Sequence, residues 1–335
     1  MKNKKILITG GTGSFGNKFV EKLLEIKAKK IIIFSRDEMK QWDMMNKYKS
    51  RNNLRFFLGD VRDKSRLARA IDDVDIVVHA AAQKIVPSSE YNPIEAIKTN
   101  ILGAMNLIDV CIDKKVKKVV ALSTDKACNP INLYGATKLA SDKLFIAGNN
   151  YSRYSKTIFS VVRYGNVVGS RGSMVPFFIS QKKNKIPFTL THLDMTRFFT
   201  TLDDAAEMVI KAEKEMVGGE IFVNKNPSIK VINFLKCLDA KRKIKIIGVR
   251  PGEKIHETLI TESEAPFTYD YGRYYKILPS IFLNKNKKYL KKGGKKCKKN
   301  FIYNSETNSE WLNNINIKKI ILDSEKNYQI LNKKN

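Results

Sequence analysis

The sequence of 335 residues has few of the side chains that build disulfide frameworks or metal sites. It contains Cys111, Cys128, Cys237, Cys297, His79, His192 and His256, and no other cysteine or histidine. No two cysteines have the C-x-x-C spacing, which argues against a zinc-binding or disulfide-rich protein and favours a reducing compartment. The histidines are also too dispersed to indicate a metal site. We therefore expect a cytoplasmic protein that binds no metal.

Long apolar runs are missing as well. No stretch reaches the roughly 18 apolar residues that a membrane-spanning helix needs. The first residues, Met1-Lys-Asn-Lys-Lys, lead directly into a strand pattern rather than into the apolar core of a signal peptide. We expect no membrane insertion.

Acidic residues are scarce relative to basic ones. Lysine and arginine number 62 against 33 acids, a formal net charge of +29, and nine of the lysines fall within residues 285–299. Such a charge is typical of a nucleic-acid-binding protein, or of a lysine-rich composition spread over solvated faces. No nucleic-acid-binding module accompanies it, so we expect no specific nucleic-acid partner. The charge would still favour anionic ligands through its field.

Glycine is sparse, with 18 residues, but four glycines form one motif. An apolar run, Lys5-Ile-Leu-Ile-Thr9, precedes Gly10-Gly-Thr-Gly-Ser-Phe-Gly16 and a helical pattern. A tight turn, a close approach to a pyrophosphate and helix–strand packing require the first, second and third glycines of such a fingerprint. The helix N-terminus adds N–H groups and a partial positive charge. The cofactor-binding candidates here are Gly10, Thr12, Gly13, Ser14, Phe15 and Gly16.

The end of the second predicted strand, residues 30–34, bears on the choice of cofactor. Ser35 and Arg36 follow it directly, and Lys40 comes one helical turn later. Basic residues at this place neutralise the 2′-phosphate of NADP, whereas a carboxylate binds the ribose of NAD. We therefore favour NADP over NAD. Asp37 has the alternative role of capping the following helix.

Two further strands, residues 54–58 and 75–79, contribute to the same predicted pocket. Asp60 and Val61 follow the first and would flank an adenine. Ala80 and Ala81 follow the second and would allow backbone contact with the cofactor. Lys84 would then point towards the substrate, whereas His79 is interpreted as a packed structural histidine.

The central stretch of the chain, residues 117–145, carries the candidate chemistry. A buried strand over 119–122 ends in Ser123-Thr124-Asp125-Lys126, and ligands bind at the carboxyl ends of strands in open α/β sheets. Tyr134 and Lys138 are four residues apart on a predicted helix, hence on one face. An ammonium there would lower the pKa of the phenol towards that of a useful base. A solvated helix face is the alternative explanation of this pair.

The alternation of strands and helices through about residue 164 predicts an α/β fold with a Rossmann-type doubly wound parallel sheet. We assign residues 1–165 to this NADP-binding core and 166–280 mainly to a smaller substrate-binding lobe, with some segments returning to the core. Residues 281–335 form a lysine-rich C-terminal extension without assigned chemistry. A helix from Pro93 to about Ile112 has an apolar stripe, which is ordinary core or, with the helix after Tyr134, a subunit contact.

The substrate-binding candidates lie mostly in the predicted lobe. Arg197 and Arg250 are possible clamps on a diphosphate, and exposed surface arginines are the alternative. A polar, glycine-rich loop follows the strand predicted over 157–163. The full set is Lys84, Asn166, Arg171, Thr191, Arg197, Arg250 and Glu253.

The ordered motifs ITGGTGSFG, GDVRD, HAAAQK, LSTDKACNPINLYGATK, VVRYGNVVGSRGS and RPGEK resemble those of the extended short-chain dehydrogenase/reductase superfamily. More closely, the chain resembles the inverting UDP-N-acetylglucosamine 4,6-dehydratases of pseudaminic-acid biosynthesis, over about residues 4–260. The resemblance implies a lyase that acts on UDP-N-acetylglucosamine and keeps its cofactor bound. It also implies a homo-oligomer, with a hexamer as the leading candidate.

The resemblance also implies roles for the central residues. Tyr134, assisted by Lys138, would take the proton of the sugar 4-hydroxyl. Lys126 would remove the C5 proton as a neutral amine, which requires its pKa to fall well below the usual value. Asp125 would protonate the departing 6-hydroxyl, with Thr124 positioning groups.

Three alternatives remain open. Retaining sugar-nucleotide dehydratases commonly have Asp-Glu where this chain has Asp125-Lys126, but some membrane-anchored retaining enzymes share Asp-Lys. A retaining or C3-epimerising dehydratase is therefore possible. A simple 4-epimerase needs no acid/base pair for C6, so Asp125-Lys126 argues against it. From a different class, the chain could be an inactive cofactor-binding or nucleic-acid-binding scaffold.

Overall fold

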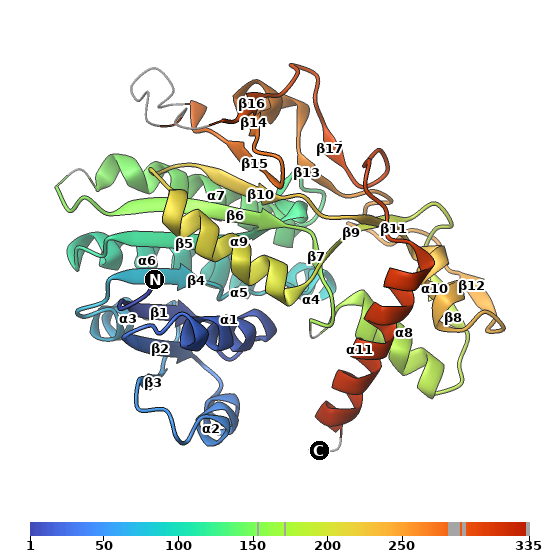
Figure 1. Ribbon diagram of the computed structural model, residues 1–335, viewed down its shortest axis with the longest axis horizontal. Coiled ribbons are helices and arrows are strands. Elements are labelled where there is room, and N and C mark those ends of the chain that lie inside the picture. Colours follow the sequence, from blue (N-terminus) through green and yellow to red (C-terminus); the bar gives the residue numbers. More distant parts are fainter. Residues whose placement is uncertain (153, 171, 281–288, 290–292, 333–335) are drawn as a thin grey trace.

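A ten-stranded sheet forms the centre of the protein (Figure 1). The computed structural model describes residues 1–332 except 153, 171, 281–288 and 290–292. The strand order is β16-β14-β15-β10-β6-β5-β4-β1-β2-β3. Parallel strands run from β10 to β3, whereas β14, β15 and β16 extend the sheet in antiparallel fashion. This architecture confirms the predicted α/β, Rossmann-type fold.

The parallel strands are short apolar segments, as expected for strands that are buried on both faces. Their bounds are β1 Lys5–Thr9, β2 Lys30–Ser35, β3 Leu54–Leu58, β4 Ile76–His79, β5 Lys118–Thr124, β6 Ile158–Tyr164 and β10 Ile221–Asn224. Because they are parallel, their carboxyl ends share one edge of the sheet. The glycine motif and the Ser-Thr-Asp-Lys segment therefore lie at the same edge.

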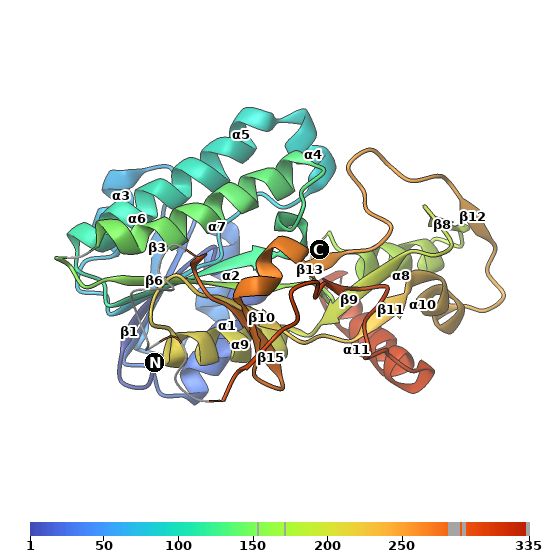
Figure 2. The same cartoon turned by 90° about the horizontal axis from the view of Figure 1, so that it is seen from above.

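Helices cover both faces of this sheet (Figure 2). On one face pack α1 (Ser14–Glu25) and α9 (Leu202–Glu215), against alternate strand residues such as Ile6 and Ile8. On the other face pack α3 (Lys64–Ala70), α6 (Gly103–Asp113) and α7 (Leu133–Tyr151), against the intervening residues such as Leu7. The period of two along each strand thus divides the core into two layers. Helix α2 (Glu38–Lys47) lies beside β2 and the edge strand β3.

The helix predicted from residue 93 to 112 is interrupted. It consists of α5 (Pro93–Ile97), a π-helical turn η1 (Lys98–Leu102) and α6, preceded by α4 (Val86–Tyr91). Wide π turns often occur at functional sites. Here the turn carries Thr99, which faces the main cavity, and Asn100, whose amide bonds Gln83 and Thr137.

A smaller lobe has its own apolar core, which joins α8 (Met174–Lys183), α10 (Val231–Leu238) and α11 (Asn314–Asn332). One three-stranded sheet consists of β7 (Asn166–Val167), β9 (Thr196–Thr200) and β11 (Ser228–Lys230), and a pair consists of β8 (Phe188–Leu190) and β12 (Ile244–Ile246). The segments α9, β10, β14 (Thr268–Asp270) and β15 (Tyr274–Ile277) belong to the main sheet layers. Residues 166–280 therefore contribute to both parts.

The C-terminal extension is largely built into the fold. Strand β17 (Tyr303–Asn304) pairs with β13 (Thr258–Ile260), and Ile317 and Ile321 of α11 are buried against the lobe. Strand β16 (Lys295–Lys296) adds to the sheet edge. Of the basic segment, Lys285, Lys287, Lys288, Lys291 and Lys292 lie outside the described residues, and Lys295, Lys296, Lys298 and Lys299 are exposed. In the part of the chain that the structure describes, no helix could cross a membrane.

Candidate active site

A cavity of about 860 Å³ lies at the carboxyl edge of the parallel sheet. Its wall is formed by the loops after β1, β2, β3, β4, β5 and β6 and by the first turns of α7. Most of the residues that the sequence singles out meet here, although they come from points far apart in the chain. The predicted lining residues that the structure places here are Gly10, Thr12, Gly13, Ser14, Phe15, Gly16, Ser35, Arg36, Lys40, Val61, Ala80, Ala81, Lys84, Thr124, Asp125, Lys126, Tyr134, Lys138 and Asn166.

The glycine loop fits a dinucleotide pyrophosphate. Gly10 has φ +66°, and a Cβ atom there would lie 2.9 Å from the backbone nitrogen of Ala81. A Cβ atom at Gly16 would lie 2.2 Å from the carbonyl oxygen of Gly11, which explains the close packing of α1 on the loop. Gly13 is the N-cap of α1 and has no side chain to cap the helix. The first turn of α1 lines the cavity and receives no cap from a side chain at position 13, as a phosphate site at a helix N-terminus requires.

The basic residues after β2 lie at one end of the cavity. Ser35, Arg36 and Lys40 line it together with Asp37. The Asp37 carboxylate accepts a hydrogen bond from the Lys40 amide nitrogen at 2.9 Å and so caps α2, which confirms its predicted structural role. The Lys40 ammonium also pairs with Asp37. Arg36 remains half-exposed, with its guanidinium 3.6 Å from Asp60.

The carboxylate of Asp60 is held by a neighbouring arginine. Its carboxylate accepts hydrogen bonds from Arg62 at the backbone nitrogen, at Nε and at Nη2, over 2.9, 3.0 and 2.7 Å. Within the described chain the cavity is lined at this point by Gly59 and Val61 instead. The Asp60 carboxylate therefore holds this loop, and its contact with an adenine stays a prediction.

The Ser-Thr-Asp-Lys segment forms the inner wall. Strand β5 ends at Thr124, whose hydroxyl accepts from the Lys126 amide and starts the short helix η2 (Asp125–Ala127). The same hydroxyl donates to Asp125 Oδ1 at 2.9 Å. Lys126 Nζ donates to Asp125 Oδ1 at 3.1 Å. The predicted acid and amine are therefore in direct contact.

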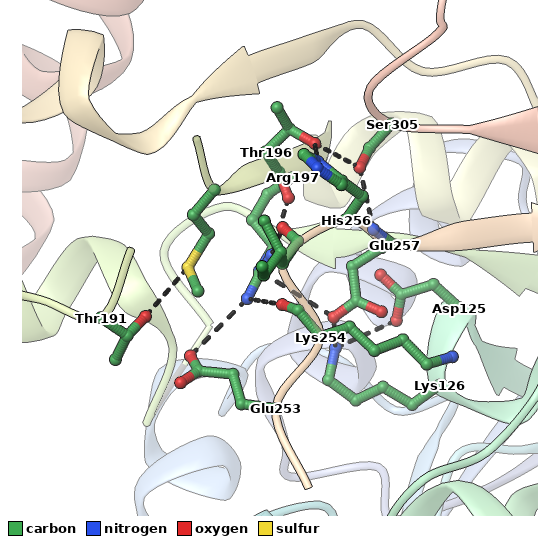
Figure 3. Close-up of polar contacts among 12 residues, drawn as sticks. Asp125, Lys126, Thr191, Thr196, Arg197, Glu253, Lys254, His256, Glu257 and Ser305 are labelled. Carbon is green, nitrogen blue, oxygen red and sulfur yellow. Dashed lines mark hydrogen bonds and ion pairs between the residues drawn. The ribbon is translucent and has the colours of Figure 1, made fainter. Parts of the chain in front are cut away.

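Sequence analysis missed the second partner of this amine. Lys126 Nζ also donates to Glu257 Oε1 at 3.0 Å (Figure 3). Glu257 is 2% exposed, although it stands 131 positions away in the chain. The sequence does place the Glu257 carboxylate immediately before the apolar strand β13. Because acids are rarely buried unless paired, this position could have indicated a buried ion pair.

The two acids set the protonation of this cluster. Burial alone would lower the pKa of Lys126, but attraction by Asp125 and Glu257 outweighs burial and raises it. Burial, and then repulsion from Glu257, raise the pKa of the Asp125 carboxyl. Burial would raise the pKa of Glu257, but Lys126 and Arg197 hold it below its usual value. The lowered pKa that a neutral Lys126 requires is therefore not found in this arrangement, since two carboxylates stabilise the charge of the amine.

Tyr134 and Lys138 both project into the cavity wall from the start of α7. Burial raises the pKa of Tyr134 to about 12, and the cation that opposes this effect is Lys126. Lys138 Nζ donates to the carbonyl oxygen of Leu122 at 2.7 Å, and burial lowers its pKa. Lys126 therefore has the charge effect on the phenol that sequence analysis assigned to Lys138.

On the substrate side, Lys84 and Asn166 line the cavity. Lys84 Nζ donates to Ser170 Oγ at 3.5 Å. Asn166 Oδ1 is buried without a hydrogen-bond partner among the described residues, so it can accept from a ligand. Arg171 lies outside the described residues.

Four of the predicted substrate residues are absent from the cavity lining, as far as the described chain defines it: Thr191, Arg197, Arg250 and Glu253. Arg197 is 6% exposed, and its guanidinium donates to the carbonyl oxygens of Thr196, Lys254 and Ile255. The diphosphate clamp assigned to Arg197 is therefore wrong, because its donors are used inside the protein. Glu253 lies 3.6 Å from the same guanidinium, and the Thr191 hydroxyl donates to the Met195 sulfur at 3.4 Å. Arg250 is exposed in the loop before Glu253.

The geometry agrees with comparisons to known proteins. Residues 6–279 match the polysaccharide biosynthesis protein family. A Campylobacter jejuni protein named UDP-N-acetylglucosamine 4,6-dehydratase (inverting) is 52% identical over 331 residues, which cover 96% of this chain and 98% of the relative. A Rickettsia bellii protein named UDP-glucose 4-epimerase is 43% identical over 333 residues and 96% of each chain.

Solved structures show the same architecture. Pen from Bacillus thuringiensis is 35% identical, with a TM-score of 0.88 over 97% of this chain and 98% of that one. DesIV, a dTDP-glucose 4,6-dehydratase from Streptomyces venezuelae solved with NAD, has a TM-score of 0.67 over 75% of this chain and 86% of its own. At 23% identity, DesIV bears on the fold alone. The chain therefore belongs to the polysaccharide biosynthesis protein family and has the fold of the extended short-chain dehydrogenases/reductases.

Proposed function

We propose that this protein is an NADP-dependent UDP-N-acetylglucosamine 4,6-dehydratase that inverts C5. Its product would be UDP-2-acetamido-2,6-dideoxy-β-L-arabino-hex-4-ulose. The observation that carries the proposal is the contact of Lys126 with Asp125 beside Tyr134, in a cavity that begins at a glycine loop. The high identity to the Campylobacter jejuni enzyme supports the substrate. Because water leaves without net oxidation, the reaction class is that of a lyase.

The cofactor would lie along the glycine loop, with its phosphates at the N-terminus of α1. When bound, it would supply the redox chemistry by accepting hydrogen from C4 and returning it at C6. Ser35, Arg36 and Lys40 would hold the 2′-phosphate, which is why we favour NADP over NAD. Ala80 and Ala81 would lie against the cofactor backbone.

Tyr134 would take the proton of the sugar 4-hydroxyl. A phenol with a pKa near 12 is almost entirely protonated at neutral pH, so the phenolate that acts as the base needs nearby positive charge to form. Lys126 lowers the Tyr134 pKa. The Leu122 carbonyl oxygen holds the Lys138 ammonium, which would orient the cofactor ribose and the Tyr134 phenol by hydrogen bonding.

Elimination would use Asp125 and Lys126 as one unit. Lys126 first passes its proton to Asp125 across the 3.1 Å contact, and the raised pKa of the carboxyl makes this transfer less costly. The free amine then takes the C5 proton. The protonated Asp125 gives its proton to the departing 6-hydroxyl, which leaves as water. A proton from solvent then adds to C5 from the opposite face, which gives the inverted sugar, and Lys126 and Asp125 are again an ammonium and a carboxylate.

The proposal is tested by incubating the purified protein with UDP-N-acetylglucosamine in D₂O and following the product by NMR. The expected product is the 4-keto-6-deoxy sugar with deuterium at C5 and inverted configuration there. A product without deuterium at C5, or no loss of water, contradicts the proposal. Retained C5 configuration, or exchange also at C3, would assign the retaining or C3-epimerising alternative.

A 4-epimerase is the second candidate, favoured by the Rickettsia bellii relative. An epimerase returns hydrogen to C4 and leaves the 6-hydroxyl in place. The same NMR experiment with UDP-glucose distinguishes it, because an epimerase gives UDP-galactose and no 6-deoxy signal. The ion pair of Asp125 and Lys126 has no task in that reaction, so we rank the epimerase second.

We also propose that the protein is a homo-oligomer, with a hexamer as the leading candidate. Apolar side chains of α5, η1 and α6 are at least two-fifths exposed: Ile94 63%, Ile97 42%, Leu102 41% and Met105 45%. Their row on neighbouring helices would be covered by another subunit. Light scattering after size-exclusion chromatography gives the subunit number, and a monomer contradicts this assignment.

A further inference from the structure

A chain of polar side chains extends from Lys126 to the C-terminal extension (Figure 3). Lys126 Nζ contacts Glu257 Oε1 at 3.0 Å. The Glu257 amide nitrogen donates to Ser305 Oγ at 2.9 Å, and the Ser305 amide donates to the Glu257 carbonyl oxygen at 2.8 Å. Ser305 Oγ also lies 2.7 Å from Thr196 Oγ1, which contacts His256 Nδ1 at 2.8 Å. Ser305 thus forms a hydrogen bond with both backbone polar groups of Glu257, the N–H and the carbonyl oxygen.

The two carboxylates that share Lys126 are unusually deeply buried. The side chains of Asp125 and Glu257 are 1% and 3% exposed, whereas that of Lys126 is 24% exposed. Asp125 Oδ2 and Glu257 Oε2 are buried and have no hydrogen-bond partner among the described residues. Each acid therefore commits its other oxygen to the same ammonium.

Arg197 adds a fixed charge behind Glu257. Its Nε lies 3.9 Å from Glu257 Oε1, and its Nη atoms are occupied by backbone carbonyl oxygens. Because those carbonyls fix the guanidinium, Arg197 cannot swing towards Lys126. Glu257 is consequently held between a fixed cation from β9 and the reacting amine at the end of β5.

We propose that Glu257 is a positioning residue for the elimination step, which holds Lys126 Nζ against Asp125, and that Ser305 fixes Glu257 in this place. The assignment of the step rests on the proposed dehydratase function. Ser305, directly after β17, would thereby act on the acid/base pair through Glu257. Neither Glu257 nor Ser305 belongs to the cavity lining in the described chain.

A purely structural role would predict a different outcome from a positioning role. Loss of the Glu257 charge leaves Lys126 paired with Asp125 alone, so the amine and the acid no longer keep the arrangement that elimination needs. A displacement of about 1 Å in a reacting group can cost on the order of 100-fold in rate. Oxidation at C4 uses Tyr134 and Lys138, and no contact in the described chain joins Glu257 to either of them. Lys126 also acts on the phenol through its charge, and its contact with Asp125 keeps that charge in place when Glu257 is neutralised. Elimination should therefore slow while oxidation continues.

The test compares Glu257→Gln, Glu257→Asp and Ser305→Ala with the wild type. Glu262→Gln is the matched control, because this exposed glutamate lies in the same segment. After mixing with UDP-N-acetylglucosamine, Glu257→Gln should turn over about 100-fold more slowly and accumulate the near-ultraviolet absorbance of reduced cofactor. Ser305→Ala should show the same signature more weakly, Glu257→Asp should recover part of the rate, and Glu262→Gln should match the wild type.

A measurement without substrate separates this inference from the function it rests on. The groups that face Lys126 are Asp125, Glu257, Arg197, Lys84 and Tyr134. In a side-chain NMR titration, the Lys126 signal is assigned by its loss in Lys126→Met. That signal should titrate at lower pH in Glu257→Gln and be unchanged in Glu262→Gln.

Each outcome bears on one of the two proposals. A wild-type protein that leaves UDP-N-acetylglucosamine unchanged overturns the proposed function, and the Lys126 titration then decides on Glu257 alone. An unshifted Lys126 signal, or parallel loss of oxidation and elimination in the well-folded Ser305→Ala protein, overturns the role of Glu257.

Discussion

His79 Nδ1 lies 2.8 Å from the hydroxyl oxygen of Thr9, at the point where β4 and β1 end side by side. The hydroxyl also accepts a hydrogen bond from the Ala81 amide at 3.2 Å, so its own proton is available to the ring. The ring is 1% exposed and packs against Phe145. This confirms the prediction of a structural histidine.

We expect His79 to make the protein less stable in acid. Burial, and then repulsion from Lys138, lower its pKa from 6.5 to about 3. Between pH 6.5 and 3 the His79 ring is therefore protonated in the unfolded chain but neutral in the folded protein. The free energy of unfolding falls as the pH drops through this range. The contribution is up to about 1.4 kcal/mol per pH unit in that window and is absent above it.

Urea unfolding across this pH range measures the effect. His79→Gln should lose this part of the slope, whereas His192→Gln, at an exposed position, should keep it. Equal slopes for His79→Gln and the wild type would show that another group dominates.

The glycine loop predicts a steric effect that can be separated from backbone strain. Gly10→Ala places Cβ 2.9 Å from the Ala81 backbone, whereas Gly272→Ala meets no atom within 4 Å, and both glycines have positive φ. The backbone conformation alone costs an alanine about 1–2 kcal/mol. We expect Gly272→Ala to lose that amount and keep its cofactor, and Gly10→Ala to lose more and to bind the cofactor poorly. Thermal unfolding and cofactor content measure both, and equal losses would contradict the close-packing argument.

Removal of Arg36 should change cofactor preference. A hydrogen bond to a charged group contributes about 1.5–3 kcal/mol, so Arg36→Ala should weaken NADP binding about 10- to 100-fold. NAD has no 2′-phosphate and its affinity should be unaffected. Calorimetric titration of cofactor-free protein with each dinucleotide measures this, with the exposed Lys49→Ala as control. A parallel loss of both affinities would argue against 2′-phosphate recognition.

A buried arginine of β6, the strand beside β5, should contribute to the stability of the protein. Arg163 is 1% exposed, and its Nη1 donates to both carboxylate oxygens of Glu264, at 3.0 and 3.1 Å. Its Nη2 lies 3.6 Å from Asp142 Oδ2. Arg163→Met leaves these acids without their cation, which typically costs about 3–5 kcal/mol. Urea unfolding measures the loss, and Arg51→Met, at an exposed position, should change it little. A small effect for Arg163→Met would mean that the acids take up protons instead.

The sequence was informative where the chemistry is local. The glycine loop, Asp37 and the Thr124–Lys126 segment each occupy a few consecutive residues, so turn geometry, capping and strand ends could be inferred directly. Residues that depend on distant partners were harder to interpret. An arginine such as Arg197 is a common phosphate ligand, but here its guanidinium donates hydrogen bonds to three backbone carbonyl oxygens. No sequence pattern reveals these contacts.

The protonation of the site illustrates the same difficulty. From the sequence, Lys126 has one neighbouring acid and the prospect of a lowered pKa. The fold adds Glu257, whose position depends on the pairing of β13 with β17 near the end of the chain. Asp125 and Glu257 together outweigh the effect of burial on the Lys126 pKa, and only the three-dimensional contact supplies Glu257.

The pairing of β13 with β17 also has a consequence for biosynthesis. On the ribosome, domains tend to fold from the N-terminal side as the chain emerges. The strands from β1 to β6 can assemble before Ser305 has been translated. The nascent protein would then hold a dinucleotide before its acid/base pair is secured, and competence for dehydration would arrive with the last stretch of the polypeptide.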